Sequence, residues 1–202
     1  MPPAARQSQG LYDSQFEHDA CGVGLVADLS GHRTHHTVAQ ALTVLRNLDH
    51  RGAKGSDPGT GDGAGILTQM PDALFRASCE FELPAPGSYA AGLVFLPGDP
   101  AARASARAHV ARLAAEEGLS VLGWRDVPHD ANFCGTGARA TMPRLAQLFV
   151  AAPGGDAGLA LDRHAFCLRK RMEHETGLYP ASLSSATIGY KGMLTALQLA
   201  PF

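Results

Sequence analysis

The sequence predicts an α+β fold in which β-sheets are covered by helices. Strand-like and helix-like segments mix along the chain without the strict alternation of doubly wound α/β proteins. The chain has 202 residues, of which 45% are hydrophobic and 18% are charged, as expected for a globular domain with its own core. No stretch approaches the length of about 18 consecutive apolar residues that a membrane span needs, so none is expected.

The predicted strands are short, largely apolar runs bounded by Gly, Pro, Ser or Asp. They cover residues 21–27, 65–70, 89–96, 119–126, 145–151 and 182–190. The first of them begins at Cys21 and contains only small or apolar residues, which indicates a buried strand.

The predicted helices cover residues 36–49, 72–78, 101–117 and 162–175. In the first, apolar residues recur at helical spacing and Thr37 is a candidate N-cap. The third precedes Gly118, a typical glycine stop. Residues 127–141 are expected to form a loop.

Residues 1–20 are polar and lack the apolar core of a secretory signal, so we interpret them as a tail or leader.

Four cysteines without a CxxC pair predict free thiols, a reducing compartment and a cytoplasmic protein. A net charge of −2 favours neither nucleic acid nor an anionic membrane as a partner. His32, His35 and His36 cluster in a polar turn without the spacing of zinc ligands, so no metal site is expected.

Cys21 is a candidate nucleophile because it opens a segment of small residues. Only the thiolate is a good nucleophile, so a catalytic cysteine needs a base. An α-amine at the chain's own N-terminus, which titrates near pH ~8, would serve. The alternative is an inert cysteine that packs in the core.

A glycine-rich loop follows the first predicted helix, with six glycines from Gly52 to Gly65 inclusive. Such density lets backbone N–H groups face a ligand, and Arg51 just before the loop offers a planar fork for a carboxylate. The alternatives are a flexible connector and a helix-terminal ion pair. The loop lacks the spacing of phosphate-binding loops.

Seven segments share a common resemblance, in order and at plausible spacings. They are Cys-Gly-Val-Gly-Leu at 21–25, Leu-Asp-His-Arg-Gly at 48–52, Thr-Gly-Asp-Gly-Ala-Gly-Ile at 60–66, Trp-Arg-Asp-Val-Pro at 124–128, Gln-Leu-Phe-Val at 147–150, Arg-Lys-Arg at 169–171 and Ser-Leu-Ser-Ser-Ala-Thr-Ile-Gly-Tyr-Lys-Gly at 182–192. Together they resemble the start of the large chain of glutamate synthase, whose N-terminal module is a class II, Ntn-type glutamine amidotransferase.

The resemblance implies that residues 1–20 are a leader whose removal exposes Cys21 as the N-terminal nucleophile for L-glutamine. The Cys21 thiolate would attack the glutamine amide, releasing ammonia and then glutamate. Arg51 would order the site. The remaining expected substrate-site residues belong to the glycine-rich loop: Gly52, Gly61, Asp62 and Gly63.

The resemblance also implies a four-layer αββα Ntn-hydrolase sandwich, with residues 21–202 as its N-terminal part and the fold incomplete at the C-terminus. An Asn-Gly oxyanion pair and the residues that grip glutamine are expected beyond Phe202. FMN, an iron–sulfur cluster and a small electron-donating subunit would belong to the complete synthase, and no cofactor is expected in this chain. The alternative is a truncated, non-catalytic amidotransferase-like fragment.

Overall fold

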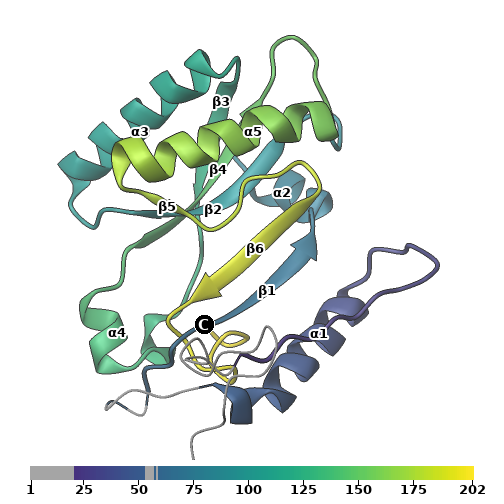
Figure 1. Ribbon diagram of the computed structural model, residues 1–202, viewed down its shortest axis with the longest axis vertical. Helices are drawn as coiled ribbons and strands as arrows, with labels where there is room; N and C mark the ends of the chain where they lie inside the picture. The colour runs from purple at the N-terminus through teal and green to yellow at the C-terminus, as the bar shows by residue number, and fades with distance from the viewer. Residues whose placement is uncertain (1–20, 53–56, 58) are drawn as a thin grey trace, which may run out of the picture.

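The computed structural model describes residues 21–52, 57 and 59–202, so the predicted leader at 1–20 lies outside the described residues. Figure 1 shows the described elements. In chain order they are α1 (His35–Asn47), the 3-10 turn η2 (Asp49–Arg51), β1 (Ala64–Gln69), α2 (Asp72–Ser78), β2 (Ala90–Leu96), α3 (Pro100–Glu116), β3 (Ser120–Asp126), the 3-10 turn η3 (Ala131–Phe133), α4 (Thr136–Ala140), β4 (Arg144–Ala151), α5 (Leu159–Arg171), the π-helical turn η4 (Met172–Thr176), β5 (Tyr179–Pro180) and β6 (Thr187–Gly192).

The strands form two antiparallel sheets, which confirms the predicted α+β class. The larger sheet has the order β3-β4-β2-β5, and the smaller one pairs β1 with β6. In the smaller sheet Ala64 lies opposite Gly192 and Gln69 lies opposite Thr187. This pairing joins the glycine-rich loop before β1 to the chain that follows β6.

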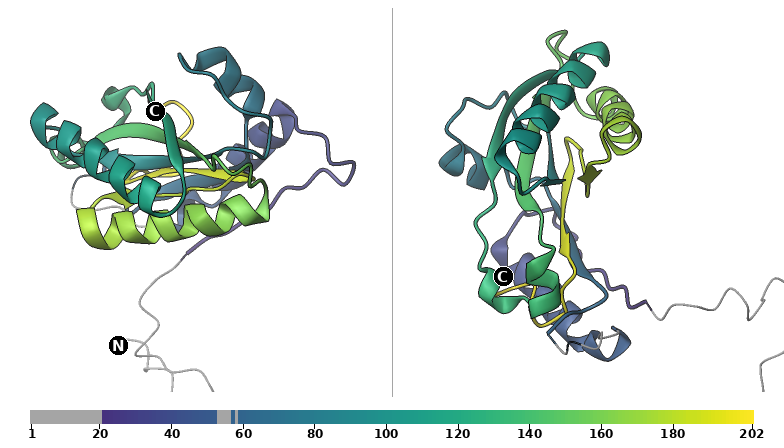
Figure 2. Two further views of the ribbon diagram at one scale, coloured as in Figure 1. Left: turned by 90° about the horizontal axis from the view of Figure 1, so that it is seen from above. Right: turned by 90° about the vertical axis from the view of Figure 1, so that its left-hand side faces the viewer.

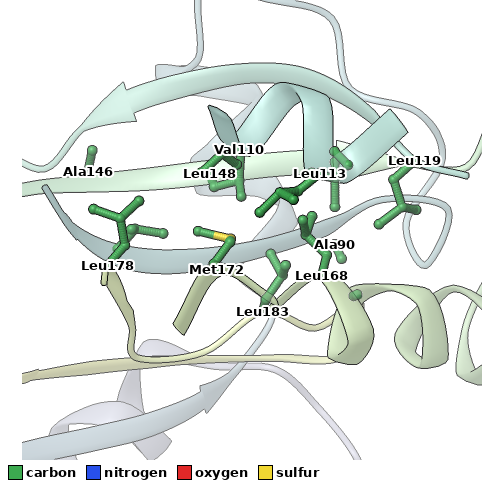
Figure 3. Packing of buried hydrophobic residues seen from close by; sticks show 14 of the residues in the cluster. Ala90, Val110, Leu113, Leu119, Ala146, Leu148, Leu168, Met172, Leu178 and Leu183 are labelled. Carbon is green, nitrogen blue, oxygen red and sulfur yellow. The ribbon is translucent and has the colours of Figure 1, made fainter. Parts of the chain in front are cut away.

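Both faces of the larger sheet are buried, because successive side chains of a strand point to opposite faces. Leu148 and Val150 of β4 join the main core beneath α3 and α5, part of which Figure 3 shows. Phe149, between them, faces the other way and packs edge-on against Phe75 of α2, with ring centroids 5.0 Å apart. Figure 2 accordingly shows α5 and α2 on opposite sides of this sheet.

The smaller sheet is tied to the larger one through β6. Ile188 of β6 is fully buried in the cluster that contains Phe75 and Phe149. The side chain of Gln147, also fully buried, donates from Nε2 to the Tyr190 hydroxyl at 2.9 Å and accepts from Arg125 Nη1 at 2.8 Å. These two hydrogen bonds give partners to the buried Gln147 amide, whose burial without partners would destabilise the fold.

The prediction of a buried strand at 21–27 is wrong. The segment has no strand pairing among the described residues, and Val23 and Leu25 are 91% and 90% exposed. Its glycines lie against α1 and the turn after it: a Cβ on Gly24 would come within 2.3 Å of Val44 Cγ1. The small residues therefore mark contact with a helix rather than a place inside a sheet.

The prediction of one strand over 182–190 is only partly right, since the regular strand covers Thr187–Gly192. The preceding residues follow the edge of β2, where a bridge joins Ala91 to Ser184. Ser182 Oγ then accepts the Gly189 N–H at 3.0 Å and holds the turn between the two parts.

Some of the predicted helix boundaries are confirmed and others are wrong. Helix α1 is capped by Thr34, whose hydroxyl accepts the Thr37 N–H, so Thr37 is not the N-cap. Gly118 ends the α3 region in the left-handed conformation at φ 72°, which confirms the predicted glycine stop. The expected loop 127–141 contains the two short helices η3 and α4.

Candidate active site

A cavity of about 150 Å³ lies where the segment beginning at Cys21, the end of α1, the glycine-rich loop and the chain after β6 meet. In Figure 1 this is the lower part of the molecule, near the C-terminus. Its lining residues are Cys21, Gly22, Leu45, Leu48, Asp49, Arg51, Gly52, Asp62, Gly63, Ala64, Leu194, Thr195 and Ala196.

The structure brings the sequence-predicted site residues together. Five of the six line this cavity: Cys21, Arg51, Gly52, Asp62 and Gly63. The sixth, Gly61, is buried directly behind it against Leu194. Residues separated by as many as 42 positions therefore share one small space.

Arg51 is the residue that contacts the candidate nucleophile. Its Nη2 donates to the backbone carbonyl of Cys21 at 3.4 Å. The arginine is held at the end of α1 because its own N–H donates to Leu48 O at 2.8 Å. The Cys21 side chain stays exposed, so a thiol at this position is accessible to a ligand in the cavity.

Gly22 permits this approach. A Cβ built on it would lie 3.2 Å from Arg51 Cβ and 3.3 Å from Leu48 Cβ, which is tighter than ordinary van der Waals contact. The absence of a side chain lets the backbone beside Cys21 rest on Arg51.

The glycine-rich loop forms the facing wall and depends on two of its glycines. A Cβ on Gly61 would lie 2.4 Å from the carbonyl oxygen of Leu194, a separation that real atoms do not adopt. Gly63 has φ +142°, a conformation that disfavours residues with a side chain. Only glycine at these positions lets the loop follow the chain after β6 so closely.

Asp57 fixes the part of the loop around residues 59 and 60. One oxygen of its carboxylate accepts the Gly59 N–H at 3.0 Å. The other accepts the Thr60 hydroxyl at 2.9 Å, the Thr136 hydroxyl at 3.1 Å and the Gly137 N–H at 3.1 Å. These bonds, with that from the Gly137 N–H the largest contribution, lower the pKa of Asp57 from 3.8 to about 2.

The other three thiols lie outside the residues that line the cavity. Cys134 is buried, and burial raises the pKa of its thiol; the same cause raises the pKa of Cys79. Cys167 is exposed on α5. Within the described part of the chain, no three His, Cys, Asp or Glu side chains come together as a metal site would require.

Sequence reasoning missed two parts of the cavity wall. Leu45 and Leu48 read as ordinary core residues of a helix, and residues 194–196 carry no recognisable pattern. The signal that could have located the latter is the pairing of β1 with β6, because it places whatever follows β6 beside whatever precedes β1.

Comparison with known proteins identifies the family of this chain. The family of class II glutamine amidotransferases matches residues 21–202. The chain is 45% identical to the glutamate synthase (NADPH) large chain of Bacillus subtilis, over 97% of this chain and 13% of that protein. It is 39% identical to ferredoxin-dependent glutamate synthase 2 of Synechocystis, over 92% of this chain and 12% of that protein.

A plant relative gives the same result: the chain is 38% identical to the chloroplastic ferredoxin-dependent glutamate synthase of Oryza sativa, over 98% of this chain and 13% of that protein. The chain thus spans about one eighth of the length of these relatives. Among the residues described here, no helix is both long and apolar enough to cross a membrane. Given a family match that covers nine tenths of its length, this chain belongs to the class II glutamine amidotransferases.

Proposed function

We propose that this chain performs the glutaminase half-reaction of a glutamate synthase, with Cys21 as the nucleophile. The observation that carries the proposal is the shared cavity, which Cys21 lines together with Arg51 and residues of the glycine-rich loop, and in which Arg51 contacts the Cys21 carbonyl. The relatives that this chain matches are named glutamate synthases, which supports the assignment, and the match covers about one eighth of their length.

The proposed reaction proceeds through a thioester. The Cys21 thiol gives its proton to the α-amine of the same residue, and the thiolate attacks the side-chain amide carbon of glutamine. The carbon–nitrogen bond then breaks, and the α-ammonium returns the proton to the departing nitrogen, which leaves as ammonia. Water hydrolyses the γ-glutamyl thioester, which releases glutamate and restores the thiol.

This mechanism requires Cys21 to be the first residue of the mature protein. We therefore propose that residues 1–20 are a leader removed by processing, and that 21–202 belong to the amidotransferase domain. Processing frees an α-amine whose ordinary pKa, near ~8, suits proton exchange at neutral pH.

The remaining site residues order Cys21 and shape the cavity. Arg51 orders the backbone of Cys21 without taking part in proton transfer. Gly52, Gly61, Asp62 and Gly63 shape the wall against which the substrate lies. A space of about 150 Å³ matches the size of cavities that hold a molecule such as benzene, and so admits the amide end of a glutamine side chain.

For the architecture, we propose the four-layer αββα sandwich of Ntn hydrolases. Supporting observations are the two antiparallel sheets joined through Ile188 and Tyr190, the cover of α3 and α5 on the larger sheet, and the contact of α1 with β1. In this arrangement α1 is the outer layer beside the smaller sheet, which brings Arg51 next to the glycine-rich loop.

The rest of the synthase reaction belongs to other parts of the complete protein. We propose that FMN, an iron–sulfur cluster and the contacts with a small electron-donating subunit lie outside this chain, and that this chain binds L-glutamine without a cofactor. Four free cysteines support a reducing, cytoplasmic location.

The test is glutamine hydrolysis by the complete protein, purified with its natural processing. We expect ammonia release from glutamine, an N-terminal sequence that begins at Cys21, and covalent labelling of Cys21 by the glutamine analogue 6-diazo-5-oxo-L-norleucine. A mature N-terminus elsewhere removes the proposed base, and labelling spread evenly over the four cysteines removes the proposed nucleophile. Either result would reject the mechanism.

A further inference from the structure

Two segments that are distant in sequence form one wall of the cavity. Residues 59–63 of the glycine-rich loop lie against residues 194–198, a turn that directly follows β6. Leu194 is 3% exposed and covers Gly61, while Thr195 lines the cavity. Since β1 and β6 fix only the neighbouring strands, the wall needs its own contacts to hold its shape.

The side chain of Gln198 supplies such a contact on both sides. Its Nε2 donates to the Gly59 carbonyl at 2.7 Å, and its Oε1 accepts the Thr195 N–H at 2.7 Å. A neutral amide carries a donor and an acceptor on one planar group, which is what this bridge requires. One side chain thus binds the loop and orients a cavity-lining backbone.

The loop is held from its other side as well. The Gly59 carbonyl also accepts the Gly135 N–H at 2.9 Å, and Asp57 joins Gly59 and Thr60 to the beginning of α4. Asp57 fixes one side of the loop, Gly61 packs on Leu194, and Gln198 adds the hydrogen bonds that join Gly59 to Thr195.

We propose that Gln198 is a positioning residue that sets the geometry of the Cys21 cavity by holding the glycine-rich loop to Thr195. It is not among the cavity-lining residues, so it acts through Thr195 on one side and Gly59 on the other. The proposal rests on the proposed function where it concerns glutamine. Displacements near 1 Å in a supporting element commonly reduce reaction rates by as much as ~100-fold.

A purely structural role predicts something different. Gln198 is only half-buried, so its loss would reduce stability modestly. A structural role would also change the accessibility of Cys21 to every reagent alike. A positioning role changes recognition of a glutamine-like reagent while leaving intrinsic thiol reactivity in place.

The experiment compares two variants in the complete protein. Gln198→Met keeps the length of the side chain and removes both hydrogen bonds. Gln198→Glu keeps the acceptor for the Thr195 N–H and replaces the donor to Gly59 O with a repelling carboxylate. The control is Gln69→Met, an exposed residue at the far end of β1.

Three quantities are measured: labelling of Cys21 by 6-diazo-5-oxo-L-norleucine, its alkylation by iodoacetamide, and hydrogen exchange in peptides that cover residues 59–65 and 193–199. We expect Gln198→Met to slow labelling by the glutamine analogue about tenfold or more, while iodoacetamide alkylation changes less than about twofold. Its 193–199 peptide should exchange faster. Gln198→Glu should retain protection at Thr195 and still label slowly, and Gln69→Met should match the wild type.

The hydrogen-exchange arm keeps this inference separate from the proposed function. If the wild type is not labelled at Cys21 by the glutamine analogue, the proposed function fails, and local exchange alone decides whether Gln198 holds the wall. Wild-type exchange at 59–65 and 193–199 in Gln198→Met would overturn the inference. Equal slowing with both reagents, together with faster exchange across the whole protein, would overturn it as well.

Discussion

Arg51 Nη2 donates to the backbone carbonyl of Cys21 at 3.4 Å, across 30 positions of sequence. This bond joins the backbone of Cys21 to the 3-10 turn η2, which follows α1. Arginine suits this position because its planar guanidinium group reaches the carbonyl while the aliphatic part of the side chain packs against Gly22. Because the contact is made with the backbone carbonyl and not with the thiol, the effect of replacing Arg51 can be measured separately from that of replacing the thiol.

Replacement of Arg51 by lysine should lower kcat/KM for glutamine hydrolysis about tenfold to a hundredfold, because lysine keeps the charge and loses the planar group that orients Cys21. Steady-state ammonia release measures the effect. Arg46→Lys, on the exposed surface of the same helix, is the matched control and should retain wild-type rates. Unchanged kcat/KM in Arg51→Lys would show that the contact with Cys21 has no role in turnover.

Cys21→Ala should eliminate glutamine hydrolysis by the complete enzyme, because the thioester cannot form without the thiol. Synthesis of glutamate from added ammonia should persist, since that chemistry is proposed to belong to other domains. Cys167→Ser provides the comparison, as this exposed thiol on α5 lies outside the cavity lining. Residual glutamine turnover in Cys21→Ala would rule out Cys21 as the nucleophile.

Gly61→Ala should disrupt the cavity wall, because the added methyl group would lie 2.4 Å from Leu194 O, and backbone on at least one side must move. We expect a loss of glutaminase activity of about tenfold or more and a lower Tm. Gly154→Ala is the control, since a Cβ there meets no atom within 4 Å. Equal Tm and activity in the two variants would contradict the close packing of Gly61 on Leu194.

Asp57 should make stability depend on pH in acid. Its pKa is about 2 in the folded protein against an ordinary value of 3.8, so its contribution is fully present above about pH 4 and is lost as the pH falls towards 2. In Asp57→Asn the free energy of unfolding should therefore fall less steeply over this window. Urea unfolding at several pH values between 2 and 4 measures the slope.

The control for Asp57→Asn is Glu80→Gln, which removes an exposed carboxylate remote from the loop. Its slope should stay close to that of the wild type. The same slope in Asp57→Asn and the wild type would mean that the hydrogen bonds to Gly59, Thr60 and Gly137 do not distinguish the folded from the unfolded state.

Tyr190→Phe should destabilise the junction of the two sheets. It removes the acceptor for Nε2 of the fully buried Gln147 and leaves that donor unpaired, at a cost of about 1–3 kcal/mol. A lower urea midpoint with an unchanged m-value would report it. Tyr179→Phe is the control, because this residue is 48% exposed and the hydrogen bond that its hydroxyl accepts from Lys191 Nζ lies at the surface, so the change in stability should be less than about 0.5 kcal/mol.

The sequence by itself determined the α+β class, the position of most strands and helices, and five of the residues that line the cavity. Local rules sufficed for Gly118, because a glycine after a helix end adopts the left-handed conformation whatever surrounds it. The expected site residues followed from the resemblance of their motifs to the start of the glutamate synthase large chain, whereas local chemistry alone left inert alternatives open.

Tertiary structure alone decided the environment of the first segment and the far wall of the site. Small residues at 22 and 24 suit a strand inside a sheet and a backbone lying on a helix equally well, and only the position of α1 selects between them. Likewise, nothing local marks Thr195 or Gln198. They join the site because the antiparallel pairing of β1 with β6 brings the two ends of a long stretch of chain together, and a hydrogen bond between such distant residues exists only once that pairing has formed.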